Sequence, residues 1–575
     1  MAEPPLLVFG PRSLTYDFGP RHPLTPRRFG PGIDLLRALG AEPAMAPEPA
    51  SDDDLLLCHT SSYIETVKRL SEIDNDPWGA PEVGIGPGDD PPFPGMHDAG
   101  AAVAGGSIRA MEAILSGDAL HAFHPGGGLH HAMPSRASGF CIYNDPALAI
   151  ARARQAGLRV LYIDLDVHHG DGVQAIHWAD PGVLTVSLHE SGRYLFPGTG
   201  SVAEVGEGPA AGSAVNVPLE PGTGEGAWLT AVEALLPELA AAFGPDIVVS
   251  QHGCDTHASD PLAHLNVSTT AMGAAARLVD VIAHRWTAGR WLATGGGGYG
   301  VYRVVPRAWA HVWLAGAHRE APDRLPAEWR SRWADEAARF GDSSLPETLD
   351  DPPNVGLPFD PDQRDAEARS LATAKLARIV SVPRLIREAV DRGWWSPIGP
   401  LLAADDGGAA RDSTGGRPEI LAVVDLDTLD RLTLAPRLLA NLDGLLLRDV
   451  LSSSALNLTM AVDGATAVGL VVSALDDPAE PSAPRSVLAI GVAPPWRRQG
   501  LATRMLAAHV DAFDGAGVPW AATVTLAERD PVEPLDRALR GAIAARIYER
   551  AGFVPETPDR SLGAVDPGAL RFVRR

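Results

Sequence analysis

Residues 160–172, VLYIDLDVHHGDG, bring together side chains that can bind a metal ion. Asp164, Asp166 and His168 alternate at the end of an apolar run, so an extended chain would direct them to one side. Two carboxylates and an imidazole on one short segment suit a divalent cation. A polar turn that caps a helix is the alternative. The further acid and second histidine that follow directly favour the metal site.

Three more turns with reactive side chains follow apolar runs in the first half of the chain. They read HPGGGLHH at 124–131, QHGCD at 251–255 and GGGGY at 295–299. Ligands of open α/β sheets bind beside the carboxyl ends of the strands. If each turn ends a strand of one parallel sheet, all four segments face a single cleft.

The elements that would position these turns repeat one pattern through residues 1 to about 320: apolar strand, polar turn, Ala/Leu-rich helix. This alternation predicts an α/β fold with a parallel sheet covered by helices on both faces. The expected strands are Leu6–Phe9, Ala119–Phe123, Val160–Ile163, Val183–Leu188, Ile247–Ser250 and Trp291–Thr294. The expected helices span 98–116, 145–156, 225–243 and 268–287.

The composition predicts a globular protein of more than one domain. Of its 575 residues, 45% are hydrophobic, which is typical of globular chains. We expect residues 1–395 to form one domain, with its motifs between 15 and 320. Residues 396–417 are predicted to be a linker, because 403–417 are small and polar. A second, smaller α/β domain is expected at 418–575.

The net charge of the chain limits the classes of molecule that it is expected to bind. A formal net charge of -24 argues against binding to nucleic acid or to an anionic membrane surface, and it favours a basic peptide. No segment has the unbroken apolar length of a membrane helix, and the N-terminus lacks the pattern of a signal peptide. The three cysteines are far apart and form no disulfide framework. These features together predict a cytoplasmic protein.

The four turns together resemble the histone-deacetylase superfamily over residues 15 to 320. The matching segments are GGLHHA at 127–132, DLDVHHGDG at 164–172, FPGTG at 196–200, GCDT at 253–256 and GGGGY at 295–299. GCDTHASDPLAHL at 253–265 and FPGM at 93–96 are most similar to the bacterial acetoin-utilisation deacetylase branch. The resemblance implies an arginase-like α/β fold and removal of acetyl groups from lysine.

The resemblance also implies a role for each polar residue of the turns. It makes Asp166, His168 and Asp255 the ligands of Zn²⁺ or Fe²⁺, which agrees with three ligands and one open position in hydrolytic zinc sites.

His131 becomes the general base and acid, oriented by Asp171, and His130 its electrostatic partner, oriented by Asp164. A carboxylate neighbour is expected to raise the pKa of each histidine. Tyr299 would donate its hydroxyl to the oxyanion.

Other positions match the substrate channel of the family. Gly139, Phe140 and Phe196 match the walls of a narrow acyl-lysine channel, and core packing is the alternative for the two aromatic rings. Asp90 matches an aspartate at the channel rim. Asp164 and Ser187 match a structural monovalent-cation (K⁺) site. Arginases share the fold but need two further acidic ligands, where this chain has Gly170 and Gly253, so a binuclear ureohydrolase is disfavoured.

The C-terminal region resembles the GNAT acetyltransferase family over about 418–575. Residues 486–513 read strand, loop and helix, followed by a strand at 520–526 and a helix that ends in YERAGF at 548–553. Backbone amides at a Gly-containing helix start can hold a pyrophosphate. The resemblance assigns acetyl-CoA binding to the loop and protonation of the thiol to Tyr548, with helix packing as the alternative. The loop residues are Arg497, Arg498, Gln499, Gly500, Leu501 and Ala502.

The expected function is therefore deacetylation of an acetylated protein, such as acetyl-CoA synthetase, by a chain that also carries an acetyl-CoA-binding or N-acetyltransferase domain. Two alternatives remain open. One is hydrolysis of acetylated polyamines or other small amides, and the other is an acyl-CoA-sensing regulator without hydrolase activity. The intact ligands, histidines and Tyr299 count against the second.

Overall fold

The computed structural model divides into two compact units, Met1–Leu385 and Ile386–Arg575. In the first unit and its last helix it describes residues 4–72, 78–352, 355 and 361–391. In the second unit it describes 419–421, 433–434, 456–463, 466–475, 485–492, 501–513, 520–525, 547–551, 553–556 and 569–574. The predicted linker at 396–417 lies outside the described residues.

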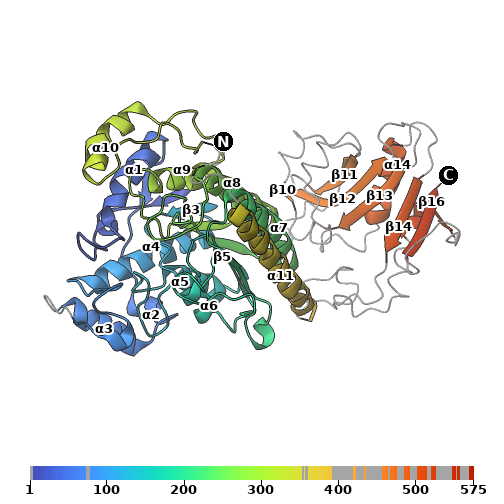
Figure 1. The fold of residues 1–575 in the computed structure, drawn as a ribbon. Helices are drawn as coiled ribbons and strands as arrows, with labels where there is room; N and C mark the ends of the chain where they lie inside the picture. Colours follow the sequence, from blue (N-terminus) through green and yellow to red (C-terminus); the bar gives the residue numbers. More distant parts are fainter. Residues whose placement is uncertain are drawn as a thin grey trace. The chain divides into compact units, whose positions relative to one another are not determined.

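An eight-stranded sheet forms the centre of the first unit (Figure 1). All its neighbouring strands pair in parallel, as the alternating pattern predicts. The central strands are apolar and buried throughout, because helices cover both faces. In sheet order the strands are β2 (Pro43–Met45), β1 (Leu6–Val8), β3 (His121–His124), β8 (Trp291–Thr294), β7 (Ile247–Gln251), β4 (Val160–Asp164), β5 (Val183–Glu190) and β6 (Ala214–Leu219).

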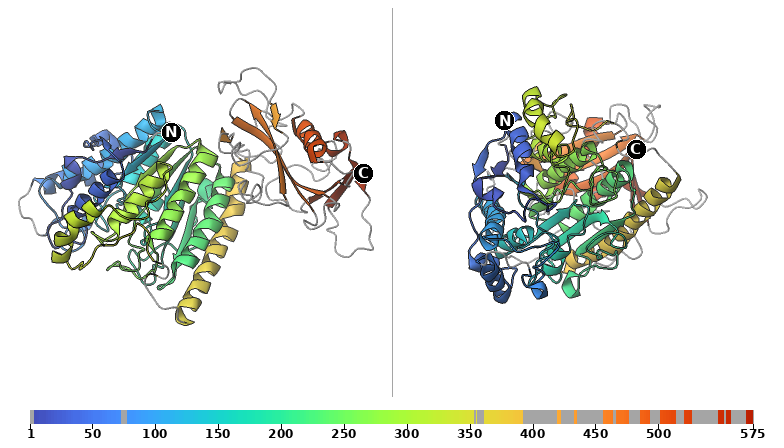
Figure 2. Two further views of the ribbon diagram at one scale, coloured as in Figure 1. Left: turned by 90° about the horizontal axis from the view of Figure 1, so that it is seen from above. Right: turned by 60° about the vertical axis from the view of Figure 1, so that its left-hand side comes forward.

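Two groups of helices enclose the sheet (Figures 1 and 2). One group is α4 (Met96–Ser116) with α5 (Asp145–Gln155), and the other is α7 (Glu225–Phe243), α8 (Thr269–Thr287) and α9 (Val305–Gly316). All four predicted helices are present, with ends within two residues of the prediction. The remaining helices of the unit are α1 (Phe29–Ala38), α2 (Asp52–Leu55), α3 (Ser61–Ser71), α6 (Asp171–Ile176), α10 (Ala327–Arg339) and α11 (Pro361–Asp391).

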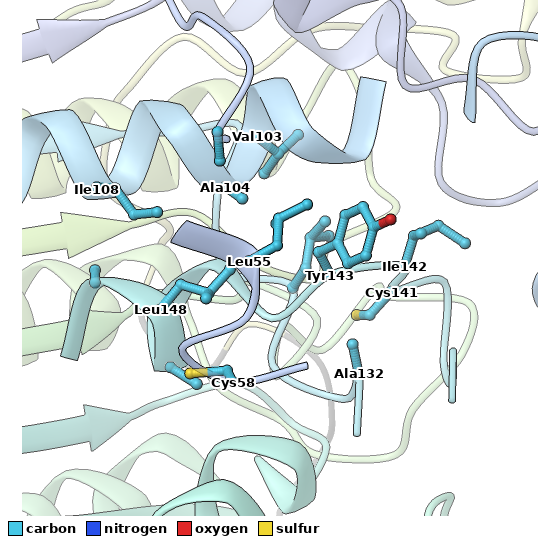
Figure 3. Packing of buried hydrophobic residues seen from close by; sticks show 14 of the residues in the cluster. Leu55, Cys58, Val103, Ala104, Ile108, Ala132, Cys141, Ile142, Tyr143 and Leu148 are labelled. Carbon is cyan, nitrogen blue, oxygen red and sulfur yellow. The ribbon is translucent and has the colours of Figure 1, made fainter. Parts of the chain in front are cut away.

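A large hydrophobic cluster lies between the sheet and the α4–α5 pair. Ile108 of α4 and Leu148 of α5 meet there with Leu55 and Tyr143, and all four are almost completely buried (Figure 3). The loop 132–143 contributes several of these side chains. Since this loop follows the His130–His131 turn directly, core packing on one side fixes the start of the site on the other.

By length and composition, one helix of the described part of the chain could cross a membrane, namely α7. Its apolar residues Trp228, Leu235, Leu236 and Leu239 are buried, and the helix packs against α8. Burial within the unit therefore accounts for its hydropathy.

The long helix α11 carries one stripe of small buried residues. Ala366, Ser370, Ala374, Ala377 and Ser381 follow one another at intervals of three or four residues and are each at most 5% exposed. This spacing places them on one face of the helix. The Ser370 hydroxyl accepts a hydrogen bond of 2.9 Å from the Glu220 amide, so α11 is attached to the end of β6.

The described strands of the second unit form a separate, mostly antiparallel sheet. Its one parallel pair along the main path joins β13 (Arg485–Val492) to β14 (Trp520–Thr525), and α14 (Leu501–Phe513) lies between them in sequence. The other strands are β9 (Glu419–Leu421), β10 (Thr433–Leu434), β11 (Leu456–Asp463), β12 (Thr466–Leu475), β15 (Val554–Glu556) and β16 (Ala569–Arg574).

Candidate metal and catalytic site

Four adjacent strands carry the candidate site at their carboxyl ends. They are β3, β8, β7 and β4, which lie side by side in this order although they are far apart in sequence. The predicted turns at 124–131, 295–299, 251–255 and 164–172 follow these strands. The parallel topology therefore brings all four turns to one edge of the sheet.

Asp166, His168 and Asp255 converge on one point. His168 Nδ1 lies 3.1 Å from Asp166 Oδ1 and 3.1 Å from Asp255 Oδ2, and the three ligand atoms lie within 4.8 Å of one another. Both aspartates are buried. The donor set, two carboxylates and one imidazole, is the chemistry of a hydrolytic zinc site.

The outer oxygens of the two carboxylates are held by hydrogen bonds from neighbouring loops. Asp166 Oδ2 accepts from Gln251 Nε2 at 2.7 Å and from the Gly297 amide at 2.8 Å. Asp255 Oδ1 accepts from the Val167 amide at 3.0 Å. These bonds fix the rotation of each carboxylate, so Asp166 Oδ1 and Asp255 Oδ2 both face His168.

The electrostatics of the three residues also fit a bound dication. Burial and the nearby Asp166 raise the pKa of Asp255 to about 6. Burial lowers the pKa of His168, but its bonds to Asp166 and Asp255 outweigh this effect and raise that pKa to about 10. Two buried carboxylates thus repel each other and attract a positive charge between them. A divalent cation satisfies this demand directly.

His130 and His131 form a second pair beside the ligands. His130 Nδ1 lies 2.8 Å from Asp164 Oδ2, and His131 Nδ1 lies 2.6 Å from Asp171 Oδ1. These are the two pairings that the family resemblance implies. The Nε2 atoms of the two rings are 3.0 Å apart. Each Nδ1 faces a carboxylate, the two Nε2 atoms contact each other, and both residues line the cavity described below.

The two histidines differ in pKa, although a rise was expected for both. For His130, burial lowers the pKa, but Asp164 and Asp166 outweigh burial and raise it to about 9. For His131, burial and then the charge of His130 lower the pKa to about 4 in spite of Asp171. The expectation is therefore wrong for His131, because it counted the carboxylate and neglected burial and the neighbouring ring.

Tyr299 lines the same cavity as the two histidines. Burial and the charges of Asp255 and Asp166 raise its pKa well above the usual value, so its hydroxyl remains a hydrogen-bond donor. The Tyr299 amide donates to Asp260 Oδ2 at 2.9 Å. The buried Arg28 donates to the Gly296 carbonyl at 2.7 Å. The glycine loop before Tyr299 is therefore held at both ends.

A cavity of about 220 Å³ leads to these residues, and Gly139, Phe140 and Phe196 are part of its lining. The Phe140 ring lies edge-on to Tyr299 and the Phe196 ring edge-on to His131, with centroid separations of 6.0 and 5.0 Å. A Cβ at Gly139 would come within 2.5 Å of the His131 ring. The absence of a side chain at 139 thus lets the wall approach the His131 ring.

The predicted rim aspartate differs from the structure by one residue. Asp90 is buried and does not line the cavity, whereas the exposed Asp89 does. Burial and the charge of Asp89 raise the pKa of Asp90 to about 8. Asp90 is therefore an internal residue of the loop, and Asp89 is the candidate for contact with substrate at the rim.

Four residues that position the site were missed in the sequence. They are Gln251, Asp260, Arg28 and Asp145. The Asp145 carboxylate accepts hydrogen bonds from the Gly128 and Leu129 amides at 2.8–3.1 Å and thereby shapes the loop before His130. For two of these residues the sequence does contain a signal, since Gln251 begins the QHGCD turn and Asp260 follows that turn closely. No local signal points to Arg28 or Asp145, because they act across long stretches of sequence.

The structure also leaves no room for the acidic ligands of a binuclear arginase-type site. A Cβ at Gly170 would lie 2.1 Å from Asp164 Oδ2, and one at Gly253 would lie 2.0 Å from Asp166 Oδ2. Any side chain at either position would displace a carboxylate of the present site. Asp164 and Ser187, which match the K⁺ site of the family, are register partners on β4 and β5.

The candidate residues of the second unit are described in part. Arg497, Arg498, Gln499 and Gly500 lie outside the described residues, as does Glu528, a possible base. Leu501 and Ala502 begin α14, and Leu501 is buried. Tyr548 is buried as well, its ring lies edge-on to Phe553 at 5.4 Å, and burial raises its pKa to about 12.

The comparisons with known proteins agree with the site in the first unit. The model of the histone deacetylase domain family matches residues 22–315. The chain belongs to the histone deacetylase family. All the residues named above between His130 and Tyr299 lie within the matched range, so Asp166, His168 and Asp255 form the candidate metal site of a deacetylase domain.

Several similar proteins come from bacteria. The acetoin utilization protein AcuC of Bacillus subtilis is 39% identical over 378 residues, which are 65% of this chain and 97% of that protein. AcuC of Staphylococcus aureus is 40% identical over 57% of this chain and 85% of its own length. The crystal structure of a histone deacetylase homologue from Aquifex aeolicus has a TM-score of 0.56 and 31% identity, and it covers 64% of this chain and 100% of its own.

Proposed function

We propose that the first unit hydrolyses the acetyl amide of acetyl-lysine in a protein substrate. The observation that carries the proposal is the joint position of two groups of residues in one cavity. His130, His131 and Tyr299 line one cavity together with the Asp166, His168 and Asp255 cluster. This arrangement supplies a cation site, a proton carrier and an oxyanion donor around one small space.

The walls of the cavity suit an acyl-lysine side chain. The edge of Phe196 contacts His131, and the edge of Phe140 contacts Tyr299. Two aromatic rings can pack along the aliphatic stem of a lysine and exclude water from the amide at its end. Asp89 at the rim could accept hydrogen bonds from the backbone of the substrate.

A divalent cation bound by Asp166, His168 and Asp255 would polarise the amide carbonyl and lower the pKa of an attacking water. His131 Nε2 accepts the proton of the attacking water, while Asp171 holds the Nδ1–H and so fixes the tautomer. The same atom then returns the proton to the departing lysine amine. The Tyr299 hydroxyl donates to the oxygen of the former carbonyl as negative charge develops there.

A comparison of substrates tests this proposal. The metal-reconstituted chain is assayed on acetyl-lysine peptides, on acetyl-lysine in acetyl-CoA synthetase, and on acetylated polyamines. We expect turnover on the protein and peptides that is abolished by a chelator and restored by Zn²⁺ or Fe²⁺. Turnover confined to acetylated polyamines would favour the small-amide alternative. Absence of turnover on all of them, with metal bound, would favour the acyl-CoA-sensing regulator.

For the second unit, we propose that it binds acetyl-CoA and acts in the manner of a GNAT domain. In support, β13 and β14 form the one parallel pair along the main path of the described sheet, and α14 lies between them in sequence. This is where the loop 497–500 would meet the start of α14. Calorimetry of the full chain with acetyl-CoA, with the Gly500→Glu variant as comparison, provides the test. No heat of binding, or equal binding by the variant, would refute the proposal.

A further inference from the structure

Four side chains outside the deacetylase site meet at the opposite edge of the same sheet. His121 is the first residue of β3, Asp280 and His284 lie one turn apart on α8, and His318 follows α9. The deacetylase residues follow the carboxyl ends of the strands, whereas His121 lies at an amino end. The four residues, named here the basal cluster, are thus separated from the deacetylase site by the length of β3.

The ligand atoms of the basal cluster point at one another. His284 Nε2 lies 3.1 Å from His121 Nε2 and 3.0 Å from His318 Nε2. Asp280 Oδ1 lies 3.7 Å from His121 Nε2, 3.5 Å from His284 Nε2 and 3.3 Å from His318 Nε2. Ligands about 2.0–2.1 Å from a tetrahedral zinc are separated from one another by roughly 3.3–3.4 Å. The observed separations scatter around this value.

Hydrogen bonds alone do not satisfy this arrangement. A neutral imidazole carries one N–H and one lone pair. The single Nε2 of His284 faces two other Nε2 atoms at about 3 Å. It can form a good hydrogen bond with only one of them. Protonation of two rings would instead place two positive charges in contact. One cation at the centre accepts a lone pair from each ring and a charge from Asp280 at the same time.

The surroundings of the cluster favour metal binding. The His121 side chain is 3% exposed and that of Asp280 is 12% exposed, so these two ligands are largely shielded from water. The His284 and His318 side chains are 42% and 34% exposed, which leaves a path from solvent. His318 has a positive φ of 51°, an uncommon backbone conformation for a residue other than glycine. It ends α9, where the Arg319 amide donates to the Leu314 carbonyl at 3.0 Å.

We propose that the basal cluster is a second metal site, which binds a divalent transition metal of the zinc class. Three imidazoles and one carboxylate complete a tetrahedral shell and leave no position for a reacting water, so the site is structural. It would tie the start of β3 to α8 and to the end of α9. The two metals of the chain would then have separate roles, one in hydrolysis and one in holding the base of the sheet.

Metal counting on the full chain tests the proposal. The wild-type chain is stripped with a chelator, reconstituted with Zn²⁺, desalted and analysed by mass spectrometry for zinc per chain. The same is done for His284→Ala/His318→Ala and for the control His264→Ala, which removes an exposed histidine outside both clusters. We expect the double variant to bind one zinc fewer than the wild type, and the control to match the wild type.

A second measurement separates the two sites. In the Asp166→Ala/Asp255→Ala background we expect one remaining zinc and a Zn²⁺-dependent rise in Tm, since a ligand that binds the folded state stabilises it. Adding His318→Ala should weaken Zn²⁺ binding by more than the 10- to 100-fold typical of a lost outer partner. Equal zinc content with and without His284 and His318, in both backgrounds, would overturn the proposal.

Discussion

At the scale of single residues, the two neighbouring histidines show how much environment decides chemistry. Both rings have a carboxylate at Nδ1 and share a contact at Nε2. Yet the pKa of His130 is raised to about 9, while burial and His130 itself lower that of His131 to about 4. His130 is therefore suited to hold a positive charge, whereas His131 is neutral at physiological pH and keeps a free lone pair.

The first prediction concerns this division of roles. His131→Ala should lower kcat on an acetyl-lysine peptide by about 10²- to 10⁴-fold, because it removes proton transfer from both halves of the reaction. His130→Ala should have a smaller effect. Zinc content and thermal unfolding are measured alongside to show that both variants retain fold and metal. A mild loss in His131→Ala together with a severe loss in His130→Ala would reverse the assignment.

The second prediction concerns the hydroxyl of Tyr299. Tyr299→Phe should lower kcat by about 10²- to 10³-fold with metal content unchanged, because one oxyanion donor is lost. The matched control is Tyr302→Phe, which removes a hydroxyl bound to Glu336 away from the cavity. Its steady-state rate should equal that of the wild type. Equal rates for both variants would remove Tyr299 from the mechanism.

Most of the site could be predicted at this scale, because residue type and spacing are themselves chemical information. Asp166 and His168 stand out by residue type and spacing, whereas Asp255 was implied by the family resemblance. The structure brings the ligand atoms of the three residues within 4.8 Å of one another. Asp90 could not be placed correctly, since the path of the loop decides which of two adjacent aspartates reaches the cavity. Arg28 was missed because it acts on a loop 268 residues away.

At the scale of elements, Asp351, whose side chain is 8% exposed, forms hydrogen bonds to three segments. Asp351 Oδ2 is 2.9 Å from His257 Nε2 and accepts from the Thr269 amide at the start of α8, and its Oδ1 accepts from Arg307 of α9 at 2.7 Å. His257 belongs to the loop that carries Asp255. The ion pair therefore links two helices to the loop of the metal site.

The third prediction is that Asp351→Asn lowers the free energy of unfolding by about 3 kcal/mol at neutral pH, because one partner of a buried pair is lost. The control, Asp350→Asn, alters a side chain that is 53% exposed and should cost less than about 1 kcal/mol. Denaturant unfolding monitored by circular dichroism measures both.

The contribution of Asp351 to the free energy of unfolding should depend on pH in a defined direction. Burial raises the pKa of Asp351, but His257, Arg307 and the Thr269 amide outweigh it and hold that pKa well below the usual value. A lowered carboxyl pKa stabilises the fold above the unfolded-state pKa of about 3.9. The stabilisation is lost as the pH falls through the folded-state value. The difference between wild type and Asp351→Asn should thus narrow below about pH 4; a constant difference would contradict the assignment.

The six predicted strands of the sheet are present, and the two that were missed are its edges. β2 begins at Pro43 and β6 contains Pro218. Proline cannot donate to a sheet ladder, so a sequence pattern that contains it argues against a central strand, whereas edge strands tolerate it. The sequence does not show the order of the strands. A proline in a short apolar segment therefore indicates either a loop or an edge strand until the topology is known.

At the scale of the whole molecule, α11 closes the first unit. Its buried stripe and the Ser370–Glu220 hydrogen bond belong to that unit, although the family match ends at residue 315. The helix also places Arg378 in an ion pair with Glu238 of α7. The stable deacetylase unit should therefore be longer than the family domain.

The fourth prediction tests this boundary. A chain that ends at residue 391 should unfold at the same temperature as the first unit of the full chain. A chain that ends at 355 should have a Tm lower by more than about 5 °C, because a buried helix face is removed. Ser370→Ala in the longer chain is a milder control. Equal Tm values for the two truncated chains would show that α11 contributes nothing to stability.

The order of strands also has a consequence for biosynthesis. β8 lies between β3 and β7 in the sheet, yet it follows both in the sequence. While the protein is being made, the place between those two strands stays empty until Trp291–Thr294 leaves the ribosome. Long-range parallel pairings of this kind form slowly, and unpaired strand edges are prone to aggregation. A nascent chain shorter than about 300 residues therefore already contains the histidines and aspartates of the site, but it lacks β8, the strand that would align β3 with β7.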